Sequence, residues 1–155
     1  MDRSELESAM ASDMRAFASA SEQLGRVFAA QNELGANDFQ ALLRIMVADV
    51  EGKPLTVGRL GASLGMSSAA MTYLVERMIA SGHIRREPDP SDRRRVILRY
   101  DDHGMQVARA FFGPLGAMTR AALADVDDAD LAAAHRVFGR MTEVIRAYER
   151  SLTED

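Results

Sequence analysis

The sequence predicts a mainly helical chain with one small β-hairpin between long helices at its two ends. Two observations lead to this fold class. Apolar residues recur at helical spacing over most of the 155 residues. One segment rich in proline, aspartate and arginine, residues 87–94, separates two short runs with partial strand alternation, 82–86 and 95–100. The length suits one domain, or one domain with an added oligomerisation element.

The first third of the chain predicts two helices. Ser4 and Glu7 have the spacing of a capping box, and apolar residues then follow at helical spacing to about residue 31. Asn37 and Gln40 form a second pair of this kind, in front of a helix that we expect to end near Asp49.

Residues 57–64 and 68–81 predict two short helices joined by a tight turn. Gly65 is free to adopt a left-handed conformation there, and Ser67 can cap the second helix. The expected inward stripe of that helix is Met71, Leu74, Val75 and Met78. An αα-hairpin that only fills a core would look similar, but the arginine-tipped hairpin that follows at once gives the layout of a winged helix.

The last third returns to helix. A helix from about residue 103 to 124 is capped by Asp101 or Asp102, and Gly113-Pro114 is expected to kink or interrupt it. Asp127 caps the last helix. The apolar positions of that helix follow a heptad-like pattern: Leu131, Ala134, Phe138, Met141, Ile145 and Tyr148. This pattern favours dimerisation through Leu131, Phe138, Met141, Ile145 and Tyr148; the alternative is a core helix of a monomer.

Charge is unevenly distributed along the chain. The net charge is −4, yet residues 53–99 contain nine basic and four acidic side chains. A basic segment in an acidic chain favours a polyanion-binding face, and the alternative is a solvated surface without a partner. The absence of cysteine excludes disulfides and thiolate chemistry. No apolar stretch would form a transmembrane helix, and the acidic start is unlike a signal peptide, so we expect a cytoplasmic protein without membrane association.

Nothing in the sequence favours an enzyme. His83, His103 and His135 are far apart and lack the spacing of metal ligands or of a catalytic triad. The glycines around residues 58–65 lack the strand and lysine of a phosphate-binding loop. The aspartates of residues 125–130 lack the pattern of a calcium loop. We therefore expect no catalytic residues, no cofactor and no metal.

Five features together resemble the MarR family of bacterial transcriptional regulators. They are Leu-Gly-Ala-Ser-Leu-Gly-Met-Ser at 60–67, Leu-Val-Glu-Arg-Met at 74–78, Gly82, Asp-Pro-Ser-Asp-Arg-Arg at 89–94, and Gly104. The resemblance covers essentially the whole chain, and its most specific part is the motif at 89–94. Departures are few: glycine stands at 61 where the family mostly has alanine, Tyr-Asp replaces Leu-Thr at 100–101, and alanines stand at 69 and 70.

The resemblance implies a homodimer that binds pseudo-palindromic promoter DNA, usually as a repressor, with two winged helix-turn-helix lobes. It divides the chain into an N-terminal dimerisation helix (1–36), a DNA-binding region (37–100) and C-terminal dimerisation helices (101–155). Many members lose affinity for DNA when a small, often aromatic, molecule binds. Two alternatives stay open: a dimeric DNA-binding protein without an effector, architectural or controlled by a partner protein, and a protein-interaction module. The arginine-rich hairpin argues against the second.

The helix at 68–81 would enter the major groove by its N-terminal half. The candidate contacts from this helix are Ser67, Ser68, Ala69, Thr72, Tyr73 and Arg77. Serine can donate to phosphates at the positive end of the helix, and alanine can contact a thymine methyl group. Arg77 has an alternative role, an ion pair with Glu76 or with the hairpin.

The hairpin supplies the remaining candidates, Arg86, Arg93, Arg94 and Arg95. The resemblance favours Arg93 or Arg94 as the side chain that enters a narrow, A·T-rich minor groove. Strand alternation predicts that another arginine turns back to Asp89 or Asp92. Arg86 would contact the DNA backbone at the base of the hairpin.

An effector pocket would lie between the first helix, the second helix and the helix after the hairpin. Methionines and aromatic residues give such an interior its adaptability, and plain core packing is the alternative for each of them. The candidate lining residues are Met10, Met14, Phe17, Phe39, Leu43, Met46, Met105, Phe111 and Phe112.

Overall fold

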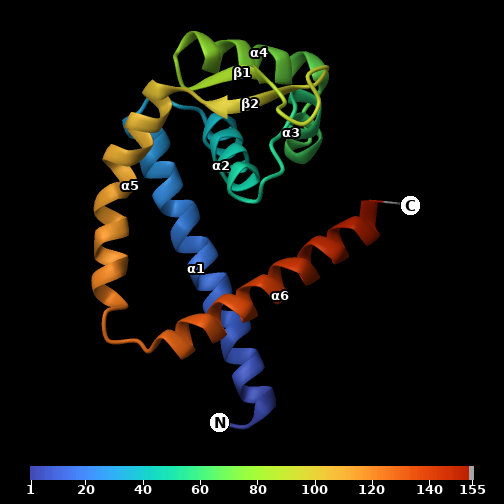
Figure 1. Cartoon of the computed structure of the whole chain (residues 1–155). Coiled ribbons are helices and arrows are strands. Elements are labelled where there is room, and N and C mark those ends of the chain that lie inside the picture. The colour runs from blue at the N-terminus through green and yellow to red at the C-terminus, as the bar shows by residue number, and fades with distance from the viewer. Residues whose placement is uncertain (154–155) are drawn as a thin grey trace. The chain divides into compact units, whose positions relative to one another are not determined.

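A computed structural model describes residues 1–153 and contains six helices and one β-hairpin over that range (Figure 1). The order is α1 (Arg3–Gln31), α2 (Ala36–Val50), α3 (Val57–Leu64), α4 (Ser68–Ala80), β1 (Ile84–Pro88), β2 (Val96–Tyr100), α5 (Asp102–Ala122) and α6 (Asp128–Thr153). The predicted fold class, mainly α with a small β-hairpin, is confirmed. None of the helices described is both long enough and apolar enough to cross a membrane.

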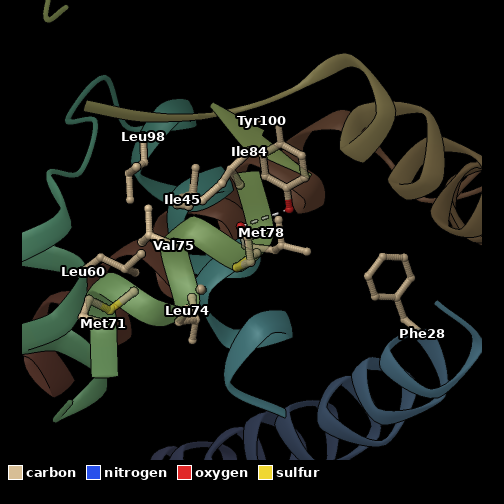
Figure 2. Close-up of a cluster of buried hydrophobic side chains, with 12 residues drawn as sticks. Phe28, Ile45, Leu60, Met71, Leu74, Val75, Met78, Ile84, Leu98 and Tyr100 are labelled. Atoms are coloured by element: carbon tan, nitrogen blue, oxygen red, sulfur yellow. Dashed lines mark hydrogen bonds between the residues drawn. The ribbon is translucent and has the colours of Figure 1, made fainter. Parts of the chain in front are cut away.

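The chain forms two compact units, Met1–Phe112 and a second from Gly113 onward. The core of the first unit gathers side chains of α2, α3, α4 and the hairpin, together with Phe28 of α1 (Figure 2). The inward stripe predicted for α4 is fully buried there: Met71, Leu74, Val75 and Met78. Burial of such a side chain contributes about 1.5–3 kcal/mol, so this stripe fixes the opposite face of α4 toward the outside.

Both helix starts in the first third differ from the predicted capping boxes. The Asp2 carboxylate accepts from Glu5 N at 2.9 Å and the Glu5 carboxylate accepts from Asp2 N at 2.8 Å, so the box lies two residues before Ser4. At α2, Gly35 N donates to the Asp38 carboxylate at 2.8 Å. Asn37 already lies inside the helix, because the buried Asp38 takes the capping role.

The helix-turn-helix is formed as predicted. Gly65 ends α3 with φ 63°, in the left-handed region where glycine has no steric cost. Ser67 then caps α4, its Oγ accepting from Ala70 N at 3.3 Å. Residues with β-branched or bulky side chains at position 65 would strain this turn.

The hairpin pairs β1 with β2 in antiparallel register, Ile84 opposite Tyr100 and Pro88 opposite Val96. The first strand starts two residues later than predicted, because Gly82 (φ 73°) and the bond from His83 N to Met78 O at 2.9 Å close the end of α4.

Hydrogen bonds anchor β2 to α2 and to the segment that precedes α3. The hydroxyl of Tyr100 donates to Leu42 O at 3.0 Å, the dashed line in Figure 2, and Leu98 N donates to Leu55 O at 2.8 Å. Burial and then the nearby Asp49 carboxylate raise the pKa of Tyr100 above its ordinary value, so the hydroxyl remains a donor.

The start of α5 packs closely on the root of the hairpin. A Cβ placed on Gly104 would lie 2.8 Å from His83 Cα and closer still to the His83 carbonyl oxygen. Asp101 N donates to that oxygen at 3.0 Å, and Gly104 N donates to Gly82 O at 3.1 Å. Glycine is therefore required at 104 by close approach of two backbones.

The second unit contains the end of α5 and all of α6. The sequence predicted a kink or an interruption at Gly113-Pro114, and the interruption does not occur: α5, a helix of 21 residues, continues through Pro114. Pro114 removes one backbone donor, and the other backbone bonds of the helix maintain it. The carbonyl of Asp127 accepts from Asp130 N and Leu131 N, both at 3.0 Å, as expected for the residue that precedes α6.

Candidate nucleic-acid interface

The outward face of α4 is open and polar at its N-terminal half. Ser68, Ala69, Thr72 and Tyr73 are exposed, and Tyr73 keeps 70% of its accessible surface. Thr72 Oγ1 donates to Ser68 O at 2.9 Å, so its hydroxyl is oriented along the helix while its methyl group remains free. The structure thus brings these four sequence candidates onto one face, beside the capping residue Ser67.

Arg77 lies one turn beyond Tyr73 and forms an ion pair that the sequence did not indicate. Its guanidinium hydrogen-bonds the carboxylate of Asp38 in α2, and not Glu76 or the hairpin, the two partners that the alternative role considered. The Asp38 side chain is only 5% exposed, whereas Arg77 is half exposed. The same guanidinium lies 5.7 Å from the centre of the Tyr73 ring. Arg77 therefore connects the first turn of α2 with the exposed face of α4.

Glu76 is instead the partner of Arg86. The two side chains approach to 2.8 Å and join the middle of β1 to α4. Arg86 was expected to contact a DNA backbone, and the structure places it in this structural pair, with about a third of its side chain exposed.

The three arginines at the tip of the hairpin differ in whether they form an ion pair. Arg94 is 93% exposed and lies 3.4 Å from Asp92. Arg95 turns back to Asp89 at 3.4 Å. Arg93 is exposed and forms no ion pair with any residue of the range 1–153. Two arginines thus turn back toward aspartates, where the sequence predicted one.

Asp89 stabilises the tip from inside. Its carboxylate is nearly buried and accepts from Ser91 N at 2.8 Å and from Ser91 Oγ at 2.7 Å. These hydrogen bonds lower the pKa of Asp89, so it stays ionised and holds Arg95 nearby. The Asp-Pro-Ser-Asp sequence therefore builds a fixed turn that projects Arg93 and Arg94.

Internal pairing reduces the free positive charge of the segment 53–99. Six of its basic side chains form ion pairs: Arg77, Arg85, Arg86, Arg94, Arg95 and Arg99. Arg99, for example, contacts Asp49 at 2.5 Å and Glu87 at 3.0 Å. Within residues 1–153, Lys53, Arg59 and Arg93 form no such pair. Sequence reasoning singled out only Arg93 of these three.

The candidate effector residues are distributed over different surroundings. Phe39, Met105, Phe111 and Phe112 pack against the core of the first unit, around Phe28. Ring centres there are 5.1 Å apart for Phe28 and Phe111 and 5.7 Å apart for Phe28 and Phe39. The other candidates lie at or near the surface of α1 and α2: Met10, Met14, Phe17, Leu43 and Met46. The described residues contain no group of three or more histidine or acidic side chains placed to hold a metal ion.

Known proteins resemble this chain in sequence over the helix-turn-helix region. A model of the MarR family matches residues 36–95. YcgE of Bacillus subtilis, an uncharacterized HTH-type transcriptional regulator, is 46% identical over 48 residues, which are 31% of this chain and 31% of that protein. The chain thus matches about a third of the length of its curated relatives.

Solved structures extend the likeness to the whole chain. A MarR family protein from Bacillus stearothermophilus has a TM-score of 0.61 at 19% identity, covering 94% of this chain and 99% of that one. A mutant of MepR from S. aureus bound to an oligodeoxyribonucleotide has a TM-score of 0.50 at 14% identity, with the same coverage. At these identities the likeness concerns the fold.

Proposed function

Because a model of the MarR family matches residues 36–95, we propose that the chain is a DNA-binding transcriptional regulator of this family, a homodimer that represses transcription from pseudo-palindromic promoter DNA. The observation that carries this proposal is the pairing of an open α4 face with an arginine-tipped hairpin in one unit. Helix and hairpin together are suited to two adjacent grooves of a duplex.

The α4 face is suited to the major groove. Its first turn offers serine hydroxyls and free backbone N–H groups, which favour phosphate at the positive end of a helix. Ala69 and the methyl group of Thr72 are apolar groups of the kind that contact thymine methyls, and Tyr73 adds a hydroxyl on a long, rigid side chain. The related MepR structure contains an oligodeoxyribonucleotide, which supports duplex DNA as the partner.

The hairpin tip is suited to the minor groove. Among residues 1–153, Arg93 has no ion-pair partner, and Arg94 has a single, solvent-screened one at 3.4 Å. Either guanidinium can be released into a narrow groove, where the negative potential is strongest. Arg95 is engaged with Asp89 and acts as a support.

The dimer proposal rests on α6. Three members of its predicted stripe remain largely exposed, with Phe138 at 50%, Ile145 at 59% and Tyr148 at 66%. A helical row of large apolar side chains at this exposure favours burial against a second copy of the same helix region. Leu131 and Met141 are the half-exposed members of the same row.

Release by a small aromatic ligand is the finer part of the proposal. Four phenylalanine rings and Met105 form a soft cluster in the first unit, and a flat ligand could replace ring–ring contacts there at low cost. Asp38, which pairs with Arg77 of α4, is the chain neighbour of Phe39. Displacement of Phe39 would therefore be transmitted to α4, the DNA-facing helix, through the ion pair between Asp38 and Arg77.

Fluorescence anisotropy tests the proposal. The protein is titrated into labelled duplex from its own upstream intergenic region, across a salt series and with unrelated duplex as competitor. We expect tight binding that survives the competitor, and release on adding aromatic acids such as salicylate. Binding without release would leave a regulator that has no such effector, and no binding at low salt would refute DNA recognition.

Arg94→Ala sharpens this test. It should weaken operator binding by about 1–3 kcal/mol and reduce the salt dependence by about one phosphate equivalent. Arg44→Ala is a matched control, because Arg44 is exposed on α2. This substitution removes the same charge at a position away from the hairpin. Equal effects of the two variants would show that Arg94 acts only through net charge.

A further inference from the structure

A hollow of about 360 Å³ lies beside the tip of the hairpin, between the tip and the turn at 52–54. Its walls come from three segments: the turn at 52–54, Arg59 in the first turn of α3, and the hairpin residues 89–91 with Arg95 and Arg99. We propose that this hollow binds a phosphate group, and that in the DNA complex the group is a backbone phosphate of the duplex.

The charge of the hollow is predominantly positive. Four basic side chains line it and Asp89 is the one acid among the lining residues. Arg99 is already neutralised by Asp49 and Glu87. Lys53 and Arg59 are exposed and have no ion-pair partner among residues 1–153. The hollow therefore retains an excess of positive charge that nothing in the first unit satisfies.

Asp89 does not close the hollow to an anion. Its carboxylate is occupied by the two hydrogen bonds from Ser91, and Arg95 approaches it only to 3.4 Å. Arg95 keeps over 40% of its side chain exposed, so part of its guanidinium fork remains available to a second acceptor.

The arrangement of these cations favours a phosphate over a carboxylate. One arginine fork satisfies a planar carboxylate, whereas a tetrahedral phosphate presents oxygens in several directions. Lys53, Arg59 and Arg95 approach the hollow from the turn, from α3 and from the hairpin. Pro54 and Pro90 stiffen two of these walls, so the cations are held around a fixed volume.

The duplex is the expected source of that phosphate, and this part of the inference rests on the proposed function. Arg95 directly follows Arg93 and Arg94, which are proposed to enter the minor groove. The phosphates that border this groove would then pass the hollow beside the same hairpin tip. A free phosphorylated molecule offers the same chemistry, and the experiment separates the two sources.

The first arm uses inorganic phosphate alone. The full-length protein, in phosphate-free buffer, is followed by amide NMR while inorganic phosphate is added at constant ionic strength. We expect saturable shifts at Gly52, Lys53 and Ser91, and their loss in the double variant Lys53→Ala/Arg59→Ala. Arg44→Ala should keep them. Neither Lys53 nor Arg59 makes a side-chain hydrogen bond or ion pair within residues 1–153, so the double variant should fold, which its amide spectrum verifies.

The second arm measures DNA affinity against salt concentration. Each phosphate contact contributes about 0.9 to the slope of log K against log salt. Because the hollow holds one phosphate, the double variant should lose about 0.9 from this slope, and Arg44→Ala should leave it unchanged. Saturable phosphate binding with an unchanged slope would support the site and overturn the duplex as its source.

The absence of saturable shifts together with an unchanged slope would overturn the whole inference. A smaller slope of log K against log salt without NMR shifts on adding phosphate would overturn a preformed phosphate site. Lys53 and Arg59 would then act on the duplex only through long-range electrostatic attraction. If the unaltered protein binds no duplex at low salt, the proposed function fails, whereas the phosphate titration still decides whether the hollow binds its anion.

Discussion

The ion pair between Asp38 and Arg77 leads to a quantitative prediction for Arg77→Ala. The substitution leaves a carboxylate that is only 5% exposed with one remaining hydrogen bond, from Gly35 N. Exposed pairs contribute about 0–1 kcal/mol, and removal of one partner from a buried pair costs about 3–5 kcal/mol. Because Asp38 is buried and Arg77 half exposed, we expect a loss of about 1–3 kcal/mol in the free energy of unfolding.

Urea denaturation and a double-mutant cycle measure this loss. Asp38→Asn keeps the size of the side chain and can still accept from Gly35 N, but it carries no charge. In that background, Arg77→Ala should cost at least 1 kcal/mol less than in the unaltered protein, roughly the lower limit of the expected interaction. Equal costs in the two backgrounds would show that the ion pair does not couple α2 to α4, and would refute the reasoning.

The same variants separate support from DNA contact. If Arg77 acts mainly by holding α4, Arg77→Ala and Asp38→Asn should weaken operator binding to a similar extent. Neither should change the salt slope by a full phosphate equivalent, about 0.9. A slope change of that size for Arg77→Ala alone would instead identify Arg77 as a phosphate contact.

Three further predictions concern the stability of the first unit. Gly104→Ala should lower the free energy of unfolding by about 3 kcal/mol, because its Cβ meets His83 backbone atoms that cannot rotate away; an unchanged melting temperature would contradict the close approach. Tyr100→Phe should cost about 1–2 kcal/mol in urea denaturation by leaving the carbonyl of Leu42 without its donor, and a neutral effect would mean that water replaces the hydroxyl. Burial and then His103 lower the pKa of His83, so the unfolded chain binds the proton first and stability falls as the pH drops below about 6.5. His83→Gln should flatten that fall in denaturation at several pH values, whereas His135→Gln, on exposed α6, should not.

Local patterns were sufficient to predict most of the fold. The left-handed Gly65, the cap at Ser67 and the buried stripe of α4 each depend on residues within a few positions of one another, and all three are confirmed. Local patterns did not decide between a kink and an interruption at Pro114, and the structure shows no interruption, because the other backbone bonds of the 21-residue helix maintain it.

The partners of the charged side chains could not be predicted from local patterns. Asp38 and Arg77 are 39 positions apart, and Asp49 and Arg99 are 50 apart. Only the packing of α2 against its neighbours brings such groups together. The same packing explains why the buried Asp38, and not Asn37, takes the capping role at the start of α2. It also leaves Lys53 and Arg59 without an ion-pair partner within residues 1–153, which the sequence did not indicate.

The backbone of His83 ties three elements together, and this has a consequence for the motions of the hairpin. Its N–H is bonded to the end of α4 and its carbonyl to the start of α5, where Gly104 closes over it. Amide hydrogens at this junction should therefore exchange with solvent together, in one opening event. The turn at the tip is held separately, by Asp89 N donating to Arg95 O at 2.9 Å and Arg95 N donating to Asp92 O at 2.8 Å. The Arg94 side chain, which is 93% exposed, can reorient without opening either the root or this turn. The hairpin thus combines a stiff root and a fixed turn with an exposed arginine that can adjust to duplexes of different groove width without disturbing α4.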